Sequence, residues 1–328
     1  MHEHQRCLLI GLALSCAYLA VGQTAGKAGE DGKPHHVVVP LTTWNPGGIV
    51  SGDPNKAGAA FVIRIAQQAN QVIVPHWHPE DEHIVVVKGT WYLGSGEVFD
   101  RNAMREMNVG DYALMPKKMA HFGWSKTDSI IQVHGIGPFK VIPVDEWQFV
   151  TGWKWMPDAS LKPEPGAVSA FKWKPNDRVR SKTGAGVVLF GARSVRNKVT
   201  QYEIQGDNGA KFFEFEEELS AVPPGKTSRS GALEGTWACV SRGTPQGDLN
   251  SILYVRQDNQ TTTGVMSWPN GGTAFTSSAS KPDAIEIRLD PALGNLLLRA
   301  EYREGQLVGE WSAGSGQKGN WECSRKTP

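Results

Sequence analysis

The segment PHWHPEDE, residues 75–82, constrains most strongly how this chain can fold. Successive side chains of a β-strand point to opposite faces, so His76 and His78 would point the same way. If the chain resumes an extended course after Pro79, the Glu82 carboxylate returns to the face of the two imidazoles. Two imidazoles and a carboxylate on one face form part of a divalent-metal site. The alternative is a polar segment whose histidines are satisfied by hydrogen bonds.

A second segment, GDYALMPKKMAH at residues 110–121, supplies the missing ligand. Gly110 and Asp111 mark a turn, the following apolar run is a short strand, and Pro116 opens a loop. His121 follows that loop. We expect it to join the ligands of the first segment from a strand distant in sequence.

The composition of the rest of the chain favours β structure. The chain has 37 glycines, 20 prolines and 12 tryptophans, and long helical patterns are scarce. Short alternating apolar runs separated by turn residues fill residues 37–150, which is typical of a sandwich or barrel. The net charge of +1 argues against a nucleic-acid partner.

The spacing of these residues resembles the two motifs of the cupin superfamily. His76-x-His78-x3-Glu82-x6-Gly89 resembles the first motif, and Gly110-x5-Pro116-x4-His121 resembles the second. Three positions depart from the usual pattern: Asn70 and Lys118 stand where glycine is usual, and Ser125 stands where asparagine is frequent. Asn70 can adopt the left-handed conformation. Lys118 puts the turn of the second motif in question.

This resemblance implies a double-stranded β-helix, a jelly-roll barrel, that holds one divalent metal through His76, His78, Glu82 and His121. Such a ligand set leaves one or two coordination positions open, and Fe, Mn, Zn, Ni and Cu all accept it. The resemblance therefore favours a metal-dependent enzyme of the dioxygenase type acting on a small molecule. The alternative is a non-catalytic metal- or ligand-binding or sensing module with appended interaction domains.

Two polar residues of a late strand are further candidates for the site. Gln132 and His134 share one face of a late strand, so either could approach the metal as a catalytic residue, or could be a satisfied polar residue. His83 directly follows Glu82 and should face away. Both faces of the strand that holds Val85 and Val87 are apolar, which suits an inner sheet or a homodimer through the cupin domain.

The start of the chain resembles a secretory signal. An apolar run follows Arg6 and ends in small residues, which predicts cleavage near Gly22 and export to a periplasmic or extracellular compartment. No later segment is long and apolar enough to span a bilayer. Cys239 and Cys323 would survive cleavage, and in an oxidising compartment they are a disulfide candidate rather than two separate thiols.

The expected architecture is an all-β chain: a cupin domain, then a small SH3-like barrel, then a C-terminal antiparallel β-barrel whose first and last strands carry the two cysteines. The predicted order is a signal peptide (1–22), a flexible leader (23–36), the cupin domain (37–150), a linker (151–176), the SH3-like module (177–222), a second linker (223–231) and the C-terminal barrel (232–326).

Overall fold

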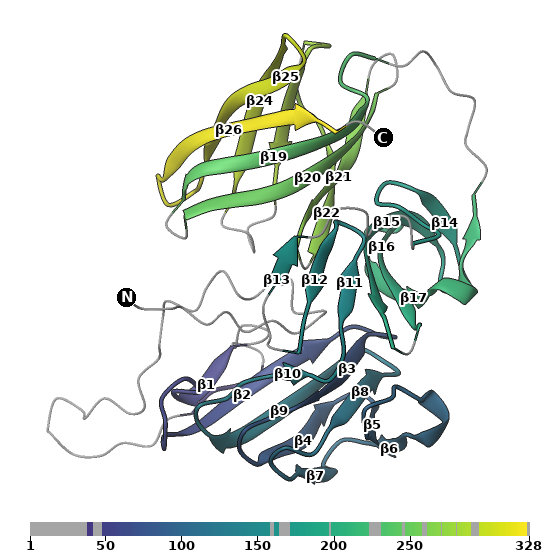
Figure 1. Ribbon diagram of the computed structural model, residues 1–328, viewed down its shortest axis with the longest axis vertical. Coiled ribbons are helices and arrows are strands. Elements are labelled where there is room, and N and C mark those ends of the chain that lie inside the picture. Colours follow the sequence, from purple (N-terminus) through teal and green to yellow (C-terminus); the bar gives the residue numbers. More distant parts are fainter. Residues whose placement is uncertain are drawn as a thin grey trace, which may run out of the picture. The chain divides into compact units, whose positions relative to one another are not determined.

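The structure is a computed structural model of the chain (Figure 1). It describes residues 38–41, 48–157, 161–163, 171–196, 198–222, 231–244, 247–257, 261–269, 271–279, 281–289 and 295–326. The predicted signal peptide and leader therefore lie outside the described residues. The chain divides into two compact units. The first runs up to Glu146, with short returns near Trp155 and Ser194, and the second holds the remainder.

The first unit is built from two five-stranded sheets. One sheet has the order β1-β2-β9-β4-β7, with β1 at Ile49–Gly52, β2 at Ala60–Gln67, β9 at Ser129–Ile136, β4 at Glu82–Lys88 and β7 at Tyr112–Met115. The other has the order β10-β3-β8-β5-β6, with β10 at Ile142–Pro143, β3 at Val72–Trp77, β8 at His121–Ser125, β5 at Trp91–Ser95 and β6 at Arg105–Met107. A 3₁₀ turn, η2, spans Arg101–Ala103.

Alternation along the strands decides which side chains fill the space between these sheets. On β4, Ile84 and Val86 are buried together with Glu82, whereas the residues between them are only partly covered. Trp91 on β5 and Phe122 on β8 are each 1% exposed. Antiparallel sheets whose inner faces meet over one apolar core form a jelly roll, so the predicted cupin-like architecture of this region is confirmed.

Two departures from the cupin pattern keep the backbone that glycine usually provides. Asn70 has φ 69° and Lys118 has φ 63°, both in the left-handed region. Asparagine adopts the left-handed conformation more readily than most residues, so Asn70 fits this position. Lys118 takes the left-handed turn although it carries a Cβ, so the loop of the second motif keeps its geometry.

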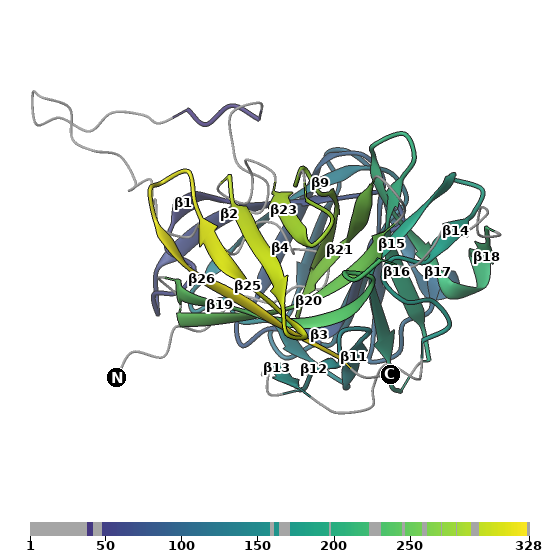
Figure 2. The same ribbon diagram turned by 90° about the horizontal axis from the view of Figure 1, so that it is seen from above.

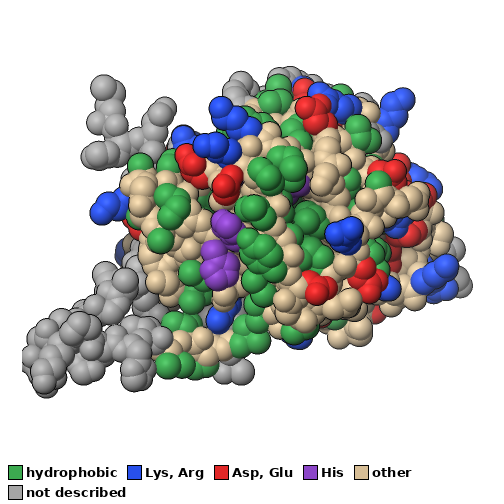
Figure 3. Space-filling view, turned by 90° about the horizontal axis from the view of Figure 1, so that it is seen from below, with side chains coloured by type: hydrophobic (Ala, Val, Ile, Leu, Met, Phe, Trp, Pro, Cys, Tyr) green, Lys and Arg blue, Asp and Glu red, His purple; other side chains and the backbone are tan. Residues whose placement is uncertain are grey.

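The outer face of the β1-β2-β9-β4-β7 sheet carries exposed apolar side chains. Tyr112 and Leu114 on β7 are 58% and 46% exposed, and Ile136 at the end of β9 is 49% exposed. Surface histidine side chains lie beside hydrophobic ones on the face drawn in Figure 3. The outer face of the β1-β2-β9-β4-β7 sheet suits the predicted homodimer, which stays a prediction.

The second unit begins at Trp147, at the end of the predicted cupin domain, and continues with short strands in the predicted linker. Its first sheet has the order β13-β12-β11-β15-β14-β18, and a hairpin of β16 and β17 pairs with β15. The bounds are β11 Trp147–Phe149, β12 Trp153–Trp155, β13 Leu161–Pro163, β14 Arg178–Arg180, β15 Ala185–Ser194, β16 Thr200–Gly206, β17 Lys211–Phe215, η4 Glu216–Glu218 and β18 Ser220–Ala221. Residues 151–176 thus contribute β12 and β13 to the sheet of the small module.

The C-terminal part of the second unit is a near-closed antiparallel barrel of eight strands in the order β22-β21-β20-β19-β26-β25-β24-β23. The bounds are β19 Gly235–Thr244, β20 Gly247–Gln257, β21 Thr262–Trp268, β22 Gly271–Thr276, β23 Ala284–Arg288, β24 Leu297–Arg303, β25 Gln306–Ser312 and β26 Lys318–Arg325. The first and last of these strands, β19 and β26, run side by side (Figures 1 and 2). Trp237, Trp311 and Trp321 fill the barrel as core residues.

Cys239 on β19 pairs directly with Cys323 on β26, and the two form a disulfide. The predicted bridge between the first and last strands of this barrel is confirmed. Over the described residues, no helix is long and apolar enough to cross a membrane.

Candidate metal centre

The four predicted ligands converge inside the first unit, and they come from both of its sheets. His76 on β3 is the registered partner of His121 on β8, so these two imidazoles lie side by side in one sheet. His78 follows the end of β3, and Glu82 begins β4 in the facing sheet. All four side chains are buried. The cluster thus lies where the two sheets face each other.

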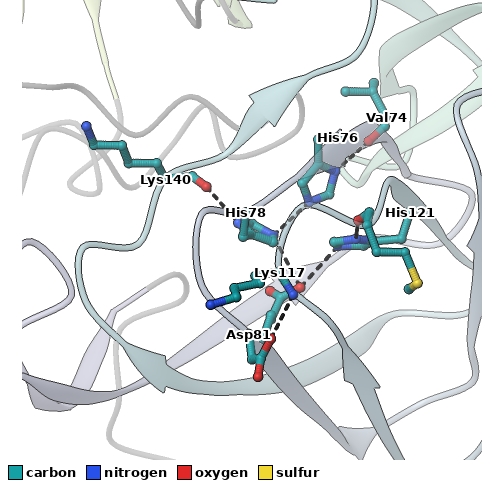
Figure 4. Close-up of polar contacts among 9 residues, drawn as sticks. Val74, His76, His78, Asp81, Lys117, His121 and Lys140 are labelled. Carbon is teal, nitrogen blue, oxygen red and sulfur yellow. Dashed lines mark hydrogen bonds and ion pairs between the residues drawn. The ribbon is translucent and has the colours of Figure 1, made fainter. Parts of the chain in front are cut away.

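The ligand atoms of the four residues lie within 4.8 Å of one another. The His76 Nε2 and His78 Nε2 atoms are 3.1 Å apart. The Glu82 Oε2 atom lies 3.2 Å from the His78 Nε2 atom and 3.1 Å from the His121 Nε2 atom. Figure 4 shows the three imidazoles turned toward one another.

Backbone carbonyls fix the orientation of each imidazole through its other ring nitrogen. The His76 Nδ1 atom lies 2.6 Å from the Val74 carbonyl oxygen, and the His78 Nδ1 atom lies 2.7 Å from the Lys140 carbonyl oxygen (Figure 4). The His121 Nδ1 atom lies 3.0 Å from the Met119 carbonyl oxygen. A carbonyl oxygen only accepts, so each Nδ1 carries the proton and donates it. Each Nε2 lone pair then points to the centre of the cluster, as in histidines that bind metals.

The donor set fits a cation. Because Nδ1 carries the proton, each neutral imidazole has no proton at Nε2 to donate. The buried Glu82 Oε2 atom accordingly has no hydrogen-bond partner. Three lone pairs and a carboxylate that face one another repel unless a positive charge lies between them. Imidazole nitrogen and carboxylate oxygen together suit a divalent transition metal.

The ionisation of the cluster matches this requirement. Burial, followed by the neighbouring His121 and His78 imidazoles, lowers the pKa of His76 well below its ordinary value. Burial alone would raise the pKa of Glu82, but the contacts with His78 and His121 lower it further than burial raises it. Near neutral pH the His76 imidazole is therefore neutral and Glu82 is ionised, which are the forms that bind metals.

A small apolar cavity adjoins the cluster. Besides the four ligands, it is lined by Ile65, Ile73, Ile84, Trp91, Gly123, Ile131, Phe139 and Val141. No lysine, arginine or further carboxylate is among these lining residues. Among the side chains that line the cavity, the charged and strongly polar ones are therefore the four clustered residues themselves.

The structure places the two candidate catalytic residues elsewhere. On β9, Ile131 and Val133 are buried in the core, so Gln132 and His134 point to the opposite, outer face of the sheet. There the Gln132 Nε2 atom lies 3.1 Å from the His134 Nε2 atom. Neither residue lines the cavity beside the metal cluster. His83 is also outside the cluster, as expected, and contacts the Tyr112 hydroxyl.

Hydrogen bonds between loops hold the two motifs together. The Lys118 backbone N–H donates to the His78 carbonyl over 2.8 Å, and the Lys117 N–H donates to the Asp81 carboxylate over 2.7 Å. The sequence pattern does not indicate Phe139 or Lys140 as neighbours of the cluster. Both follow β9 in a segment, residues 137–141, that carries no metal-ligand spacing.

No protein-family model matches this chain, and no curated protein matches it. Solved structures with cupin folds do resemble part of it. A cupin-2 domain protein from Shewanella frigidimarina shares 19% identity over 24% of this chain and 71% of its own, with a TM-score of 0.21. An RmlC-like cupin from Desulfovibrio desulfuricans shares 18% over 31% of this chain and 97% of its own, with a TM-score of 0.25. KdgF from a Halomonas species shares 20% sequence identity over 27% of this chain and 76% of its own length, with a TM-score of 0.23.

Each of these likenesses covers about a third of the chain or less. The cupin-like character of the first unit follows from its own sheet order and from the position of the four ligands. The first unit is thus a cupin-type jelly roll with a buried cluster of three histidines and one glutamate.

Proposed function

We propose that the chain binds one divalent transition metal through His76, His78, Glu82 and His121, and that it is a metal-dependent oxidoreductase of the dioxygenase type. The observation that carries this proposal is the convergence of three Nε2 atoms and one carboxylate oxygen beside an apolar cavity. A bound metal would supply a Lewis acid and, if it is Fe, Mn or Cu, a redox-active centre through which electrons of the substrate could reach dioxygen.

The residues of the cavity favour chemistry at the metal itself. The ligands come from β3, the segment after it, β4 and β8, and the cavity lies against these four residues. Coordination positions of a bound metal that the four residues do not fill would therefore be open to a molecule in the cavity. The isoleucines and Trp91 exclude bulk water. No protein acid or base other than the ligands lines the cavity, so a reaction that depends on a protein proton donor is disfavoured.

The alternative is a non-catalytic binding or sensing module. It is supported by the second unit, which adds a small β module and a barrel but, among its described residues, no further metal-ligand cluster. Under this alternative the first unit would retain a ligand without converting it.

Oxygen uptake separates the two proposals. The chain would be loaded in turn with Fe(II), Mn(II) and Cu(II) and tested with a panel of small aliphatic and aromatic hydroxy and keto compounds. We expect substrate-dependent oxygen uptake with one metal, lost at least about 100-fold in His121→Ala and retained in His83→Ala. Ligand retention on the metal-loaded chain without oxygen uptake for any compound would favour the binding module.

We also propose that the protein is exported. The Cys239–Cys323 disulfide supports this, because such bridges persist in oxidising compartments and are rare in the cytosol. The test is N-terminal sequencing of the protein recovered from a periplasmic or culture fraction. We expect it to begin close after Gly22, and an intact N-terminus in the cytosolic fraction would contradict export.

A further inference from the structure

Phe139 occupies a distinctive place beside the metal cluster. Its ring stacks on the His78 imidazole, with ring centroids 4.6 Å apart and planes 17° apart. On another side it packs against Phe61, with centroids 5.2 Å apart. All other residues that line the cavity are buried, whereas Phe139 is half-buried. The Phe139 ring therefore lies between the cavity and solvent.

The backbone that carries this ring is held at several points. The Phe139 N–H donates to the Pro54 carbonyl over 2.6 Å, and the Gly137 N–H donates to the Ala59 carbonyl over 2.8 Å. The next carbonyl, that of Lys140, accepts the hydrogen bond from His78 Nδ1. A Cβ added at Gly137 would lie 2.4 Å from the Lys56 carbonyl oxygen, so the segment packs tightly against the chain before β2. The segment is anchored, and access to the cavity depends on the Phe139 side chain.

The cavity behind Phe139 is small. Its volume is about 20 Å³, which is little more than a single water molecule requires. Its other walls are core side chains such as Ile84, Trp91 and Ile131, which are packed within strands. Core walls of this kind do not retreat without a large loss of packing. Phe139 is the wall that can change at least cost.

We propose that Phe139 is the specificity-determining residue of this site. It limits direct ligands of the metal to molecules of a few atoms without a second charged group, such as dioxygen or azide, and it excludes ring-sized ligands. This inference rests on the proposed metal binding. The size limit is set by the Phe139 side chain. The preference against a second anionic group arises because no lysine or arginine lines the cavity to pair with it.

Ligand titrations of the Cu(II)-loaded chain test the size limit. Azide and imidazole both bind copper, and each can be followed by the change in the visible absorption spectrum. We expect azide to bind the native protein at least about 10-fold more tightly than imidazole. Phe139→Ala should tighten imidazole binding at least about 10-fold and change azide binding less than about threefold. Phe139→Trp should weaken both.

Phe99→Ala is the matched control, because Phe99 packs against Phe122 with a tilted ring and does not line the cavity. It should leave the ratio of the two affinities unchanged. Equal affinities in the native protein, or the same ratio in Phe139→Ala, would overturn the inference. Copper content is measured in every sample before titration, so a native chain that holds no metal contradicts the proposed function and is not mistaken for a failure of the size limit.

Discussion

His76 and His121 lie directly opposite each other on β3 and β8, with their ring centroids 4.4 Å apart. Glu82 reaches them from β4, which belongs to the facing sheet. An ion bound by these residues would link the two sheets of the jelly roll through side chains. Metal binding should therefore contribute to the stability of the first unit as well as to its chemistry.

Metal removal should lower the melting temperature of the first unit. A metal held at a free concentration of 100 times its Kd stabilises the folded state by about 2.7 kcal/mol. We expect a chelator to lower the Tm of the native protein and to leave that of His78→Ala unchanged, as measured by differential scanning calorimetry. His83→Ala serves as the control and should respond like the native protein. Equal Tm values for the native protein with and without metal would refute the link between the sheets.

Loss of the disulfide should destabilise the C-terminal barrel. The bridge joins β19 to β26, and its cysteines are 84 residues apart in sequence. The double variant Cys239→Ala/Cys323→Ala should lower the free energy of unfolding of the barrel by about 2–4 kcal/mol, measured by denaturant titration. Metal content should not change. Thiol labelling of the native chain under denaturing, non-reducing conditions would show that the bridge is absent.

The left-handed turn at Lys118 should favour glycine. A residue with a Cβ is penalised at φ 63°, so Lys118→Gly should raise the free energy of unfolding by up to about 1 kcal/mol. Lys117→Gly is the control: its φ is not left-handed, so glycine adds only freedom to the unfolded chain and should lower stability by about 0.5–1 kcal/mol. Equal effects of the two variants would mean that the turn is not strained.

Gly123 should not tolerate a side chain. A Cβ at this position would lie 2.3 Å from the Trp91 Cζ2 atom, and Trp91 is a wall of the cavity. Gly123→Ala should cost about 1–3 kcal/mol in unfolding free energy, because the indole is buried and cannot move freely. The variant is measured by denaturant titration together with its metal content. A change below about 0.5 kcal/mol would contradict the packing described for Trp91.

The four ligands could be predicted because their positions follow local rules. Strand alternation puts His76 and His78 on one face, and the spacing around Glu82 and His121 matches the cupin motifs. The place of Cys239 and Cys323 on the first and last strands of one barrel predicts their pairing. The face shared by His76 and His78 needed only the strand period, and the disulfide needed only the order of strands, whereas the full ligand set also needed the resemblance to the cupin motifs.

The remaining parts of the site depend on information that these rules lack. The run Ser129–Ile136 has apolar residues at both Ile130 and Ile131, so its pattern does not say which face is buried. The structure buries Ile131 and Val133, and this register sends His134 outward. Phe139 lies beside His78 because of the course of the loop after β9. This loop has no alternating pattern of apolar and polar residues, so strand propensity and residue spacing do not predict its course.

Elemental analysis of the purified chain, beside the double variant His76→Ala/His121→Ala and the control His83→Ala, tests the central claim most directly. We predict one transition-metal ion per chain in the native protein and in His83→Ala, and none in the double variant. No bound metal in the native protein after reconstitution with Fe, Mn, Zn, Ni and Cu, or equal metal content in the double variant, would contradict the assignment of His76, His78, Glu82 and His121 as a metal centre.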